Sequence, residues 1–212
     1  RPMVRPLFTE YHNRAAMLGL SATPIKMQAV PMSIVYEKSY QVLMQGGYLP
    51  QVQVHDVETG TNWDPTVHLN RFTAKSLHSL GQDQSRNRLI VKTLLEKRRA
   101  GEIHRTLIFA CDIDHANNLL EELQKNNVDA AAVHSAINDR PAIQELIRDF
   151  KIGRISVLIN VQMLIHGIDV PEIDTIFMAR PTDSPVLCAQ MVGRGARLAP
   201  GKTSFQVKEF TD

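Results

Sequence analysis

The chain of 212 residues carries 24 Lys and Arg against 22 Asp and Glu, a formal net charge of +2 at pH 7. This balance excludes a strong overall field for polyanions, so any nucleic-acid groove must be a local feature. The apolar content of 43% suits a well-formed core, whereas Cys111 and Cys188 are too isolated to indicate a disulfide framework or a zinc site.

The first residues, 1–14, are mixed and polar and lack the apolar centre of a signal peptide. No apolar run approaches the roughly 18 residues that a membrane span needs. We therefore expect no membrane contact and a reducing, cytoplasmic setting. The strand-like stretch 15–24 comes almost at once, with no earlier element to pair with, and we expect the chain to be cut from a longer protein.

Residues 31–82 give a mixed pattern. The stretch YEKSYQVLMQGG predicts a short helix that ends at Gly46 and Gly47, and QVQVHDV (51–57) predicts a strand. Residues 58–81 show no clean period. No internal repeat or low-complexity tract is present.

From residue 82 onward, helical and strand periods alternate. Residues 82–99 have apolar side chains at helical spacing and end in a basic cluster, which suits the negative end of a helix dipole. Short apolar runs then predict strands, and amphipathic segments predict helices. The predicted strands are 106–111, 129–134, 155–160, 173–179 and 204–210, and the predicted helices are 112–125 and 141–150. This alternation predicts an α/β fold with a parallel sheet and right-handed crossovers.

A further helix is predicted over residues 185–198. Ser184 supplies an N-cap hydroxyl, Pro185 suits the first helical position, and the Pro-Gly pair at 200–201 supplies the stop. Leu187, Met191 and Leu198 would face the core.

Three polar residues, Gln190, Arg194 and Arg197, would share the opposite face of that helix, because they are spaced by four and three positions. Two guanidinium groups with no acid within a turn form a fork array suited to phosphate oxygens. A solvated basic stripe is an equally good interpretation of the pattern alone.

The stretch GRGARLAPGKT looks like a phosphate-binding loop but fails the register. G-x-x-x-x-G-K-[ST] would need a glycine at position 196, which is Ala196, whereas Gly195 comes one place too early. Such a loop should also follow a strand, and here a helical pattern precedes it. We therefore assign Lys202 to a turn and disfavour a small P-loop kinase.

Four segments resemble motifs III to VI of superfamily 2 helicases, in the order of that family. They are LGLSATP (18–24), TLIFACDIDHA (106–116), VLINVQMLIHGIDVPEID (157–174) and QMVGRGAR (190–197). The resemblance covers about residues 15–210 and is strongest to the branch of restriction-enzyme motor subunits and DNA translocases, where ARPTDS (179–184) is also typical. It implies a RecA-like parallel sheet flanked by helices. Residues 1–30 would end a first RecA-like domain, and 31–212 would form the second.

The resemblance implies roles at a cleft where two such domains clamp ATP. Arg194 and Arg197 would act as catalytic arginine fingers, and Gln190, Gly167 and Asp169 would contact the nucleotide. Ser21, Ala22 and Thr23 would couple ATP state to domain movement. The alternatives are a turn aspartate before Pro171 for Asp169, and a strand end forced by Pro24 for the serine-threonine segment.

Loops at the carboxyl ends of the predicted strands are the candidate nucleic-acid contacts, because parallel sheets place function there. The residues are Cys111, Asp112, His134, Ser135, Val161, Gln162, Arg180 and Thr182. A lone His134 is more often a satisfied strand-end histidine than a ligand. The implied partners are nucleic acid, with DNA favoured, the N-terminal RecA-like domain, and nuclease or methylase subunits as further candidates.

Some positions depart from the family pattern. Ile165 and His166 stand where relatives often carry Thr-Glu, and the position of Arg140 weakens a phosphate-contact role there. The chain has no P-loop and no Asp-Glu strand end to hold Mg²⁺. ATP with Mg²⁺ would be bound mainly by the missing domain, so we expect no hydrolysis by the chain alone. The alternative function is a non-hydrolysing nucleic-acid- or protein-binding module with the helicase fold.

Overall fold

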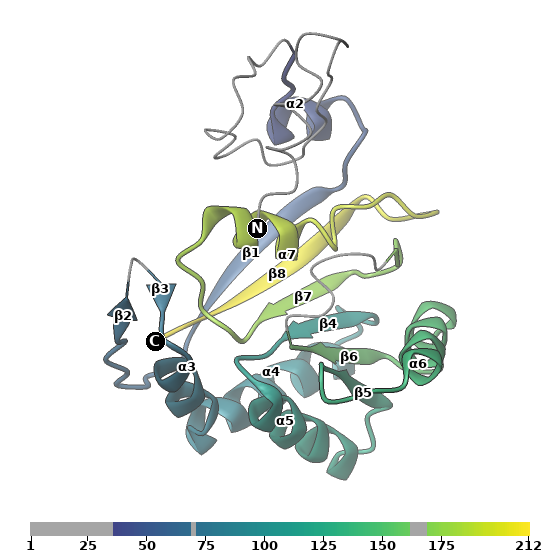
Figure 1. Cartoon of the computed structure of the whole chain (residues 1–212). Helices are drawn as coiled ribbons and strands as arrows, with labels where there is room; N and C mark the ends of the chain where they lie inside the picture. Colours follow the sequence, from purple (N-terminus) through teal and green to yellow (C-terminus); the bar gives the residue numbers. More distant parts are fainter. Residues whose placement is uncertain (1–35, 69–70, 162–168) are drawn as a thin grey trace, which may run out of the picture.

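A parallel sheet forms the centre of the computed structural model, which describes residues 36–68, 71–161 and 169–212 (Figure 1). The strand order is β1-β8-β7-β4-β6-β5, and all five pairings are parallel. In that order the strands are β1 (Gln51–Glu58), β8 (Ser204–Thr211), β7 (Thr175–Met178), β4 (Thr106–Phe109), β6 (Val157–Asn160) and β5 (Ala130–Val133). The predicted α/β parallel sheet is confirmed. The predicted boundary near residue 30 lies outside the described residues and stays a prediction.

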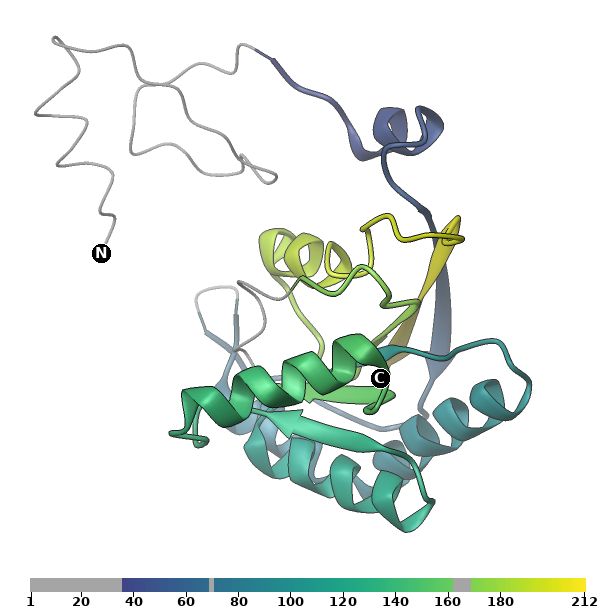
Figure 2. The ribbon, with the colours of Figure 1, turned by 90° about the vertical axis from the view of Figure 1, so that its right-hand side faces the viewer.

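Helices cover both faces of this sheet. The helices of the described residues are α2 (Tyr40–Gln45), α3 (Ala74–Gly81), α4 (Gln84–Arg99), α5 (Ile113–Lys125), α6 (Arg140–Ile152) and α7 (Pro185–Val192). Helices α4 and α5 pack on one face, and α6 and α7 pack on the other. Helix α2 buries no residue and stands apart from the other helices (Figure 2).

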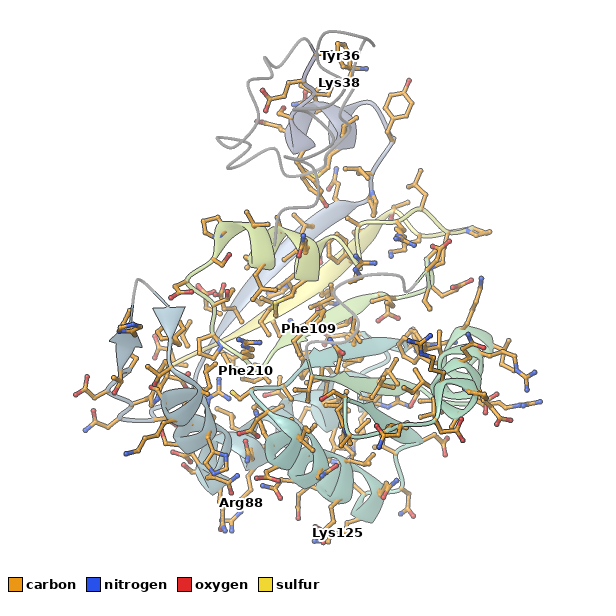
Figure 3. All side chains as sticks on the ribbon, in the orientation of Figure 1. Tyr36, Lys38, Arg88, Phe109, Lys125 and Phe210 are labelled. Carbon is orange, nitrogen blue, oxygen red and sulfur yellow. The ribbon has the colours of Figure 1, made fainter. Side chains whose placement is uncertain are left out.

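Successive residues of each central strand feed opposite apolar layers, because side chains alternate across a strand. Ile108 joins the layer under α4 and α5, while Leu107 joins the layer under α6 and α7. All residues of β4, β6 and β7 are buried, as is typical of central strands in a parallel sheet with helices on both faces. Figure 3 shows the outer surface of the helical layer, where Arg88 and Lys125 project away from the sheet.

Each of the four helices α4 to α7 follows a residue whose side chain caps its first turn. A carboxylate or hydroxyl oxygen accepts the backbone N–H three residues ahead and satisfies a donor that has no partner within the helix. The caps are Asp83, Asp112, Asp139 and Ser184, for α4, α5, α6 and α7. The predicted start of the last helix, with Pro185 in its first turn, is therefore confirmed.

The predicted end of that helix is wrong. Helix α7 ends at Val192 rather than at residue 198, and Gly193 is its C-cap. The cause is a long-range contact of Gly195: a Cβ there would lie 2.7 Å from Phe205 Cε2 and 3.1 Å from Ile176 Cδ1. The chain leaves the helix so that this glycine can lie directly on the sheet. Arg194 and Arg197 therefore do not share a helical face with Gln190.

The same early end corrects part of the predicted core. Met191, on the helix, is buried as expected, and Leu187 is partly buried. Leu198, beyond the helix, is 50% exposed and does not contribute to the core.

Residues 58–81, which show no clean period, form short elements around an aromatic pair. The antiparallel strands β2 (Val67–His68) and β3 (Arg71–Phe72) precede α3. The rings of Trp63 and Phe72 lie 5.2 Å apart and pack beside Leu77, Leu80 and Cys111. These elements are too short to repeat an apolar period, which explains why the sequence pattern did not reveal them.

Candidate functional site

Two loops lie side by side on the α7 side of the sheet. Residues 169–173, the aspartate loop, lead into β7, and residues 193–197, the arginine loop, follow α7. Lys202 joins them: its ammonium donates to the carbonyl oxygens of Pro171, at 2.9 Å, and Ile173, and to that of Gly195 at 2.6 Å.

Three of the predicted site residues meet where these loops touch. Arg197 Nη1 donates to Asp169 Oδ1 in an ion pair, and the two side chains are 36% and 72% exposed. Burial lowers the pKa of Arg194, and the nearby charge of Arg197 lowers it further, while Asp169 opposes both effects. Two guanidinium groups and one carboxylate thus form a partly exposed cluster with a net positive charge, which suits an anionic ligand.

The other residues predicted for this site are less well placed or lie outside the described residues. Gln190 is half-buried near the end of α7, shortly before the arginine loop begins at residue 193. Gly167 and the coupling residues Ser21, Ala22 and Thr23 lie outside the described residues, and their roles stay predictions.

Lys202 belongs to a turn, as predicted. Its backbone N–H donates to Ala199 O at 3.0 Å, and Gly201 at the third position has φ of +78°. Pro200 before a glycine with positive φ is typical of a type II turn. Burial lowers the pKa of the ammonium to about 8, and the group lies 5.5 Å from the centre of the Phe205 ring. Sequence reasoning missed its three acceptors because they are backbone atoms of loops elsewhere in the chain.

At the carboxyl edge of the sheet, Cys111 and Asp112 make contacts that stabilise the fold. The thiol of Cys111 is buried 3.5 Å from Ala179 O, and burial raises its pKa to about 12. Asp112 Oδ1 accepts the N–H of His115 at 2.8 Å, and its Oδ2 lies 2.7 Å from His78 Nδ1. A direct contact of either residue with nucleic acid stays a prediction.

The other residues predicted to contact nucleic acid at this edge differ in how far their side chains are exposed. Ser135 is exposed after β5, whereas Val161 is buried after β6. Thr182 Oγ1 accepts the N–H of Ser184 at 3.2 Å. Arg180 is only partly exposed, burial lowers its pKa, and Nε has no hydrogen-bond partner among the described residues.

His134 and Gln162 complete the predicted edge. His134 is half-buried in the turn after β5, and its carbonyl oxygen accepts the N–H of Ile137 at 3.1 Å. Gln162 lies outside the described residues. His134 and Arg180 follow β5 and β7, which are separated by two strands, so they mark two points along the edge.

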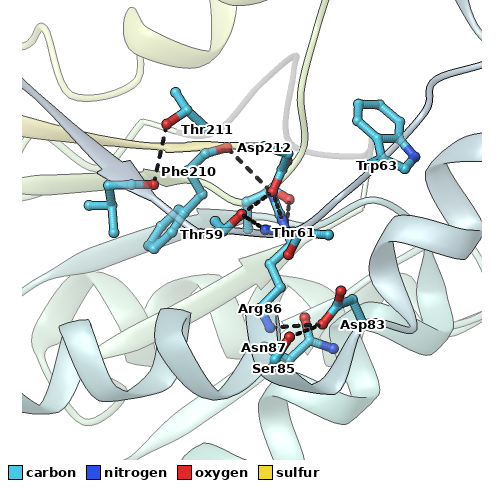
Figure 4. A network of polar contacts seen from close by, with 12 residues as sticks. Thr59, Thr61, Trp63, Asp83, Ser85, Arg86, Asn87, Phe210, Thr211 and Asp212 are labelled. Atoms are coloured by element: carbon cyan, nitrogen blue, oxygen red, sulfur yellow. Dashed lines mark hydrogen bonds and ion pairs between the residues drawn. The ribbon is translucent and has the colours of Figure 1, made fainter.

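A buried ion pair that sequence reasoning missed supports this edge (Figure 4). The guanidinium of Arg86, on α4, donates to Asp212 Oδ1 at 2.7 Å and to Ala179 O at 2.9 Å. Thr59 Oγ1 donates to the same Asp212 oxygen at 2.6 Å. The network therefore joins the ends of β7, β8 and β1 directly beside Arg180.

The described parts of the chain contain no group of three or more His, Cys, Asp and Glu side chains that could hold a metal ion. None of their helices is both long and apolar enough to cross a membrane.

Comparison with known proteins agrees with the three sequence motifs between residues 106 and 197, whereas LGLSATP (18–24) lies outside the family match. The helicase conserved C-terminal domain family matches residues 85–199. IRC3 of Saccharomyces cerevisiae, named as an ATP-dependent helicase, is 29% identical over 92% of this chain. UvrABC system protein B of Prochlorococcus marinus is 31% identical over 58% of it. The chain spans 29% and 19% of the lengths of these two relatives.

A solved structure shares the fold over nearly the whole chain. It is a fragment assigned to the HsdR subunit of a type I restriction enzyme from Vibrio vulnificus YJ016, with a TM-score of 0.76 and 22% identity. The similarity covers 97% of this chain and 41% of that one. Motifs, sheet topology and the family match agree, and the chain belongs to the helicase conserved C-terminal domain family of superfamily 2 helicases.

Proposed function

We propose that the chain is the C-terminal motor domain of an ATP-dependent helicase or translocase, and that Arg194 and Arg197 assist ATP hydrolysis. The observation that carries this proposal is the cluster of Arg194, Arg197 and Asp169 on two adjoining loops. A relative named as an ATP-dependent helicase supports the use of ATP. Nucleic acid is the proposed substrate. DNA is favoured because the solved structure that shares this fold is assigned to a subunit of a restriction enzyme.

The cluster fits the phosphate end of ATP. The Arg197 side chain is 36% exposed, so its planar fork can reach a ligand and still be held by the protein. Asp169 binds Arg197 through Oδ1 and is 72% exposed, which leaves Oδ2 accessible for a ribose hydroxyl. ATP would supply the γ-phosphoryl group, which is transferred to water as its bond to ADP breaks. Its Mg²⁺ would be held mainly by the preceding RecA-like domain.

The arginine loop would act by electrostatic stabilisation of the transition state. An exposed Arg–Asp pair contributes only about 0.2–1 kcal/mol, so a phosphate group with more negative charge can take Arg197 from Asp169 at little cost. Before the phosphate binds, Asp169 holds the guanidinium of Arg197 near the position where it is needed. Arginine fingers of this kind accelerate phosphoryl transfer by ~10³–10⁵-fold.

The carboxyl edge would contact the nucleic-acid backbone. Ser135, Thr182 and the partly exposed Arg180 offer hydroxyl and guanidinium groups to phosphate oxygens, contacts that position a strand without reading its sequence. Partners in this proposal are the N-terminal RecA-like domain and, as further candidates, nuclease or methylase subunits. The setting would be cytoplasmic.

The test is ATP turnover by the complete protein with duplex DNA, single-stranded DNA and RNA compared side by side. We expect Arg197→Ala to lower nucleic-acid-stimulated turnover by about 10³-fold or more, and Arg197→Lys to restore little of it because lysine lacks the planar fork. Arg88→Ala, an exposed arginine on α4, is the matched control.

Normal turnover by Arg197→Ala would contradict the catalytic role. Wild-type protein that binds nucleic acid without any turnover would favour the non-hydrolysing module instead. The chain alone should bind ATP weakly, and sub-micromolar affinity would contradict the assignment of most phosphate contacts to another domain.

A further inference from the structure

Lys202 matches each donor of its ammonium to a carbonyl oxygen. A protonated lysine has three N–H donors. The acceptors are Pro171 O and Ile173 O on the aspartate loop and Gly195 O on the arginine loop. A single side chain therefore bridges both loops of the candidate nucleotide site.

The backbone and the side-chain ammonium of Lys202 are each held in place by a contact of their own. The Pro-Gly turn before it sets the backbone, with the Lys202 N–H bonded to Ala199 O at 3.0 Å. The ammonium lies against the Phe205 ring, and the same ring packs on Gly195, where a Cβ would be too close. The lysine thus anchors both loops to the start of β8.

The bridged loops are those that carry the Arg197–Asp169 pair. Asp169 lies two residues before Pro171, and Arg197 lies two residues after Gly195. Any change in the distance between Pro171 O and Gly195 O moves the guanidinium of Arg197 relative to the carboxylate of Asp169. The hydrogen bonds of Lys202 and the Arg197–Asp169 ion pair therefore both set the distance between the two loops.

We propose that Lys202 is a positioning residue that holds the arginine loop and the aspartate loop at the separation needed for phosphoryl transfer. This inference rests on the proposed function. Lys202 contacts neither Arg197 nor Asp169 in the described hydrogen bonds and acts through the backbone of their loops. Misplacement of a catalytic group by about 1 Å can lower a rate by about 10²-fold.

The experiment measures kcat and KM for ATP in the complete protein with saturating nucleic acid. Lys202→Met keeps the length of the side chain and removes its donors, so kcat should fall by about 10²-fold while KM changes by less than about 3-fold. Lys202→Arg keeps donors for the carbonyl groups and should recover at least about 10-fold of the loss. Lys125→Met, at the exposed end of α5, is the matched control.

A double variant separates positioning from general support of the fold. If Lys202 acts through Arg197, adding Lys202→Met to Arg197→Ala should lower kcat by less than about 3-fold further. Equal losses in both backgrounds would overturn the proposal. If Lys202→Met does not fold, Lys202→Gln takes its place in the same cycle, with the same two outcomes.

The two proposals fail in different ways. Normal turnover by Arg197→Ala would contradict the catalytic role of Arg197 in the proposed function, and the inference would fail with it. Loss of turnover by Arg197→Ala together with wild-type kcat for Lys202→Met would overturn the inference alone.

Discussion

Two of the arginine–aspartate pairs in this chain, Arg86–Asp212 and Arg197–Asp169, have the same chemistry and opposite surroundings. In the Arg86–Asp212 pair, the side chains are 0% and 3% exposed, and the guanidinium also binds a backbone carbonyl at the end of β7. In the Arg197–Asp169 pair, they are 36% and 72% exposed. The first pair has no access to a ligand, whereas the second can exchange its partner.

Solvent decides what each pair can do. Removing one member of a buried pair leaves an uncompensated charge in a medium of low dielectric constant, which costs about 3–5 kcal/mol. Separating an exposed pair costs about 0.2–1 kcal/mol, because water and salt solvate both charges. A buried arginine therefore fixes structure, and a half-exposed arginine is suited to binding and release of phosphate. The difference lies in burial, which the two residue names do not reveal.

The largest effect should follow loss of the buried guanidinium. We expect Arg86→Ala to lower the free energy of unfolding of this chain by about 3–5 kcal/mol, because Asp212 keeps a buried charge without its partner. Urea unfolding followed by circular dichroism measures the loss. The double variant Arg86→Met/Asp212→Leu removes both charges and should recover most of the stability. A loss below about 1 kcal/mol for Arg86→Ala would contradict the structural role of the pair.

A second effect tests whether the region around Arg86 tolerates another cation. His115 is fully buried, and its Nδ1 accepts the N–H of Cys111 at 3.1 Å. Burial and, to a smaller extent, the charge of Arg86 lower the pKa of His115 to about 3, while Asp112 opposes both effects. The unfolded chain then binds a proton near pH 6.5 that the folded chain does not bind.

Stability from this histidine is therefore complete above about pH 6.5 and is lost as the pH falls toward 3. The slope should approach 1.4 kcal/mol per pH unit between about pH 6 and 4. His115→Asn keeps an acceptor for Cys111 and cannot take up this proton, so it should show a shallower slope in the same urea titrations. Parallel slopes for the two proteins would show that His115 does not carry the acid sensitivity.

Local patterns predicted most of the fold. The apolar runs at 106–111 and 155–160 predicted strands, and their alternation with helical segments predicted a parallel sheet. Ser184 and Pro185 predicted the start of α7 because capping depends on neighbouring residues. The end of α7 was predicted wrongly, since it depends on contact between Gly195 and the distant Phe205 ring.

The sequence predicted which residues form the candidate site, but only part of the contacts that hold them in place. The motif order pointed to Arg194, Arg197 and Asp169, which the structure brings together. No sequence pattern pointed to Arg86 and Asp212, which are 126 positions apart. None pointed to the acceptors of Lys202 either, because every residue type has a carbonyl oxygen. Partners formed by tertiary folding cannot be found from spacing along the chain.

The smallest effect on stability should come from the exposed pair, and it is the sharpest test of the comparison. We expect Arg197→Ala and Asp169→Asn each to change the free energy of unfolding by less than about 1 kcal/mol. Raising the salt concentration from 0.05 to ~1 M should reduce even that difference, because the Debye length falls to about 3 Å. The loss in Arg86→Ala should persist at the same salt concentration, since buried charges are poorly screened. If both pairs instead respond equally to mutation and salt, burial does not set their roles, and Arg197 would be bound too firmly to Asp169 to serve a phosphate group.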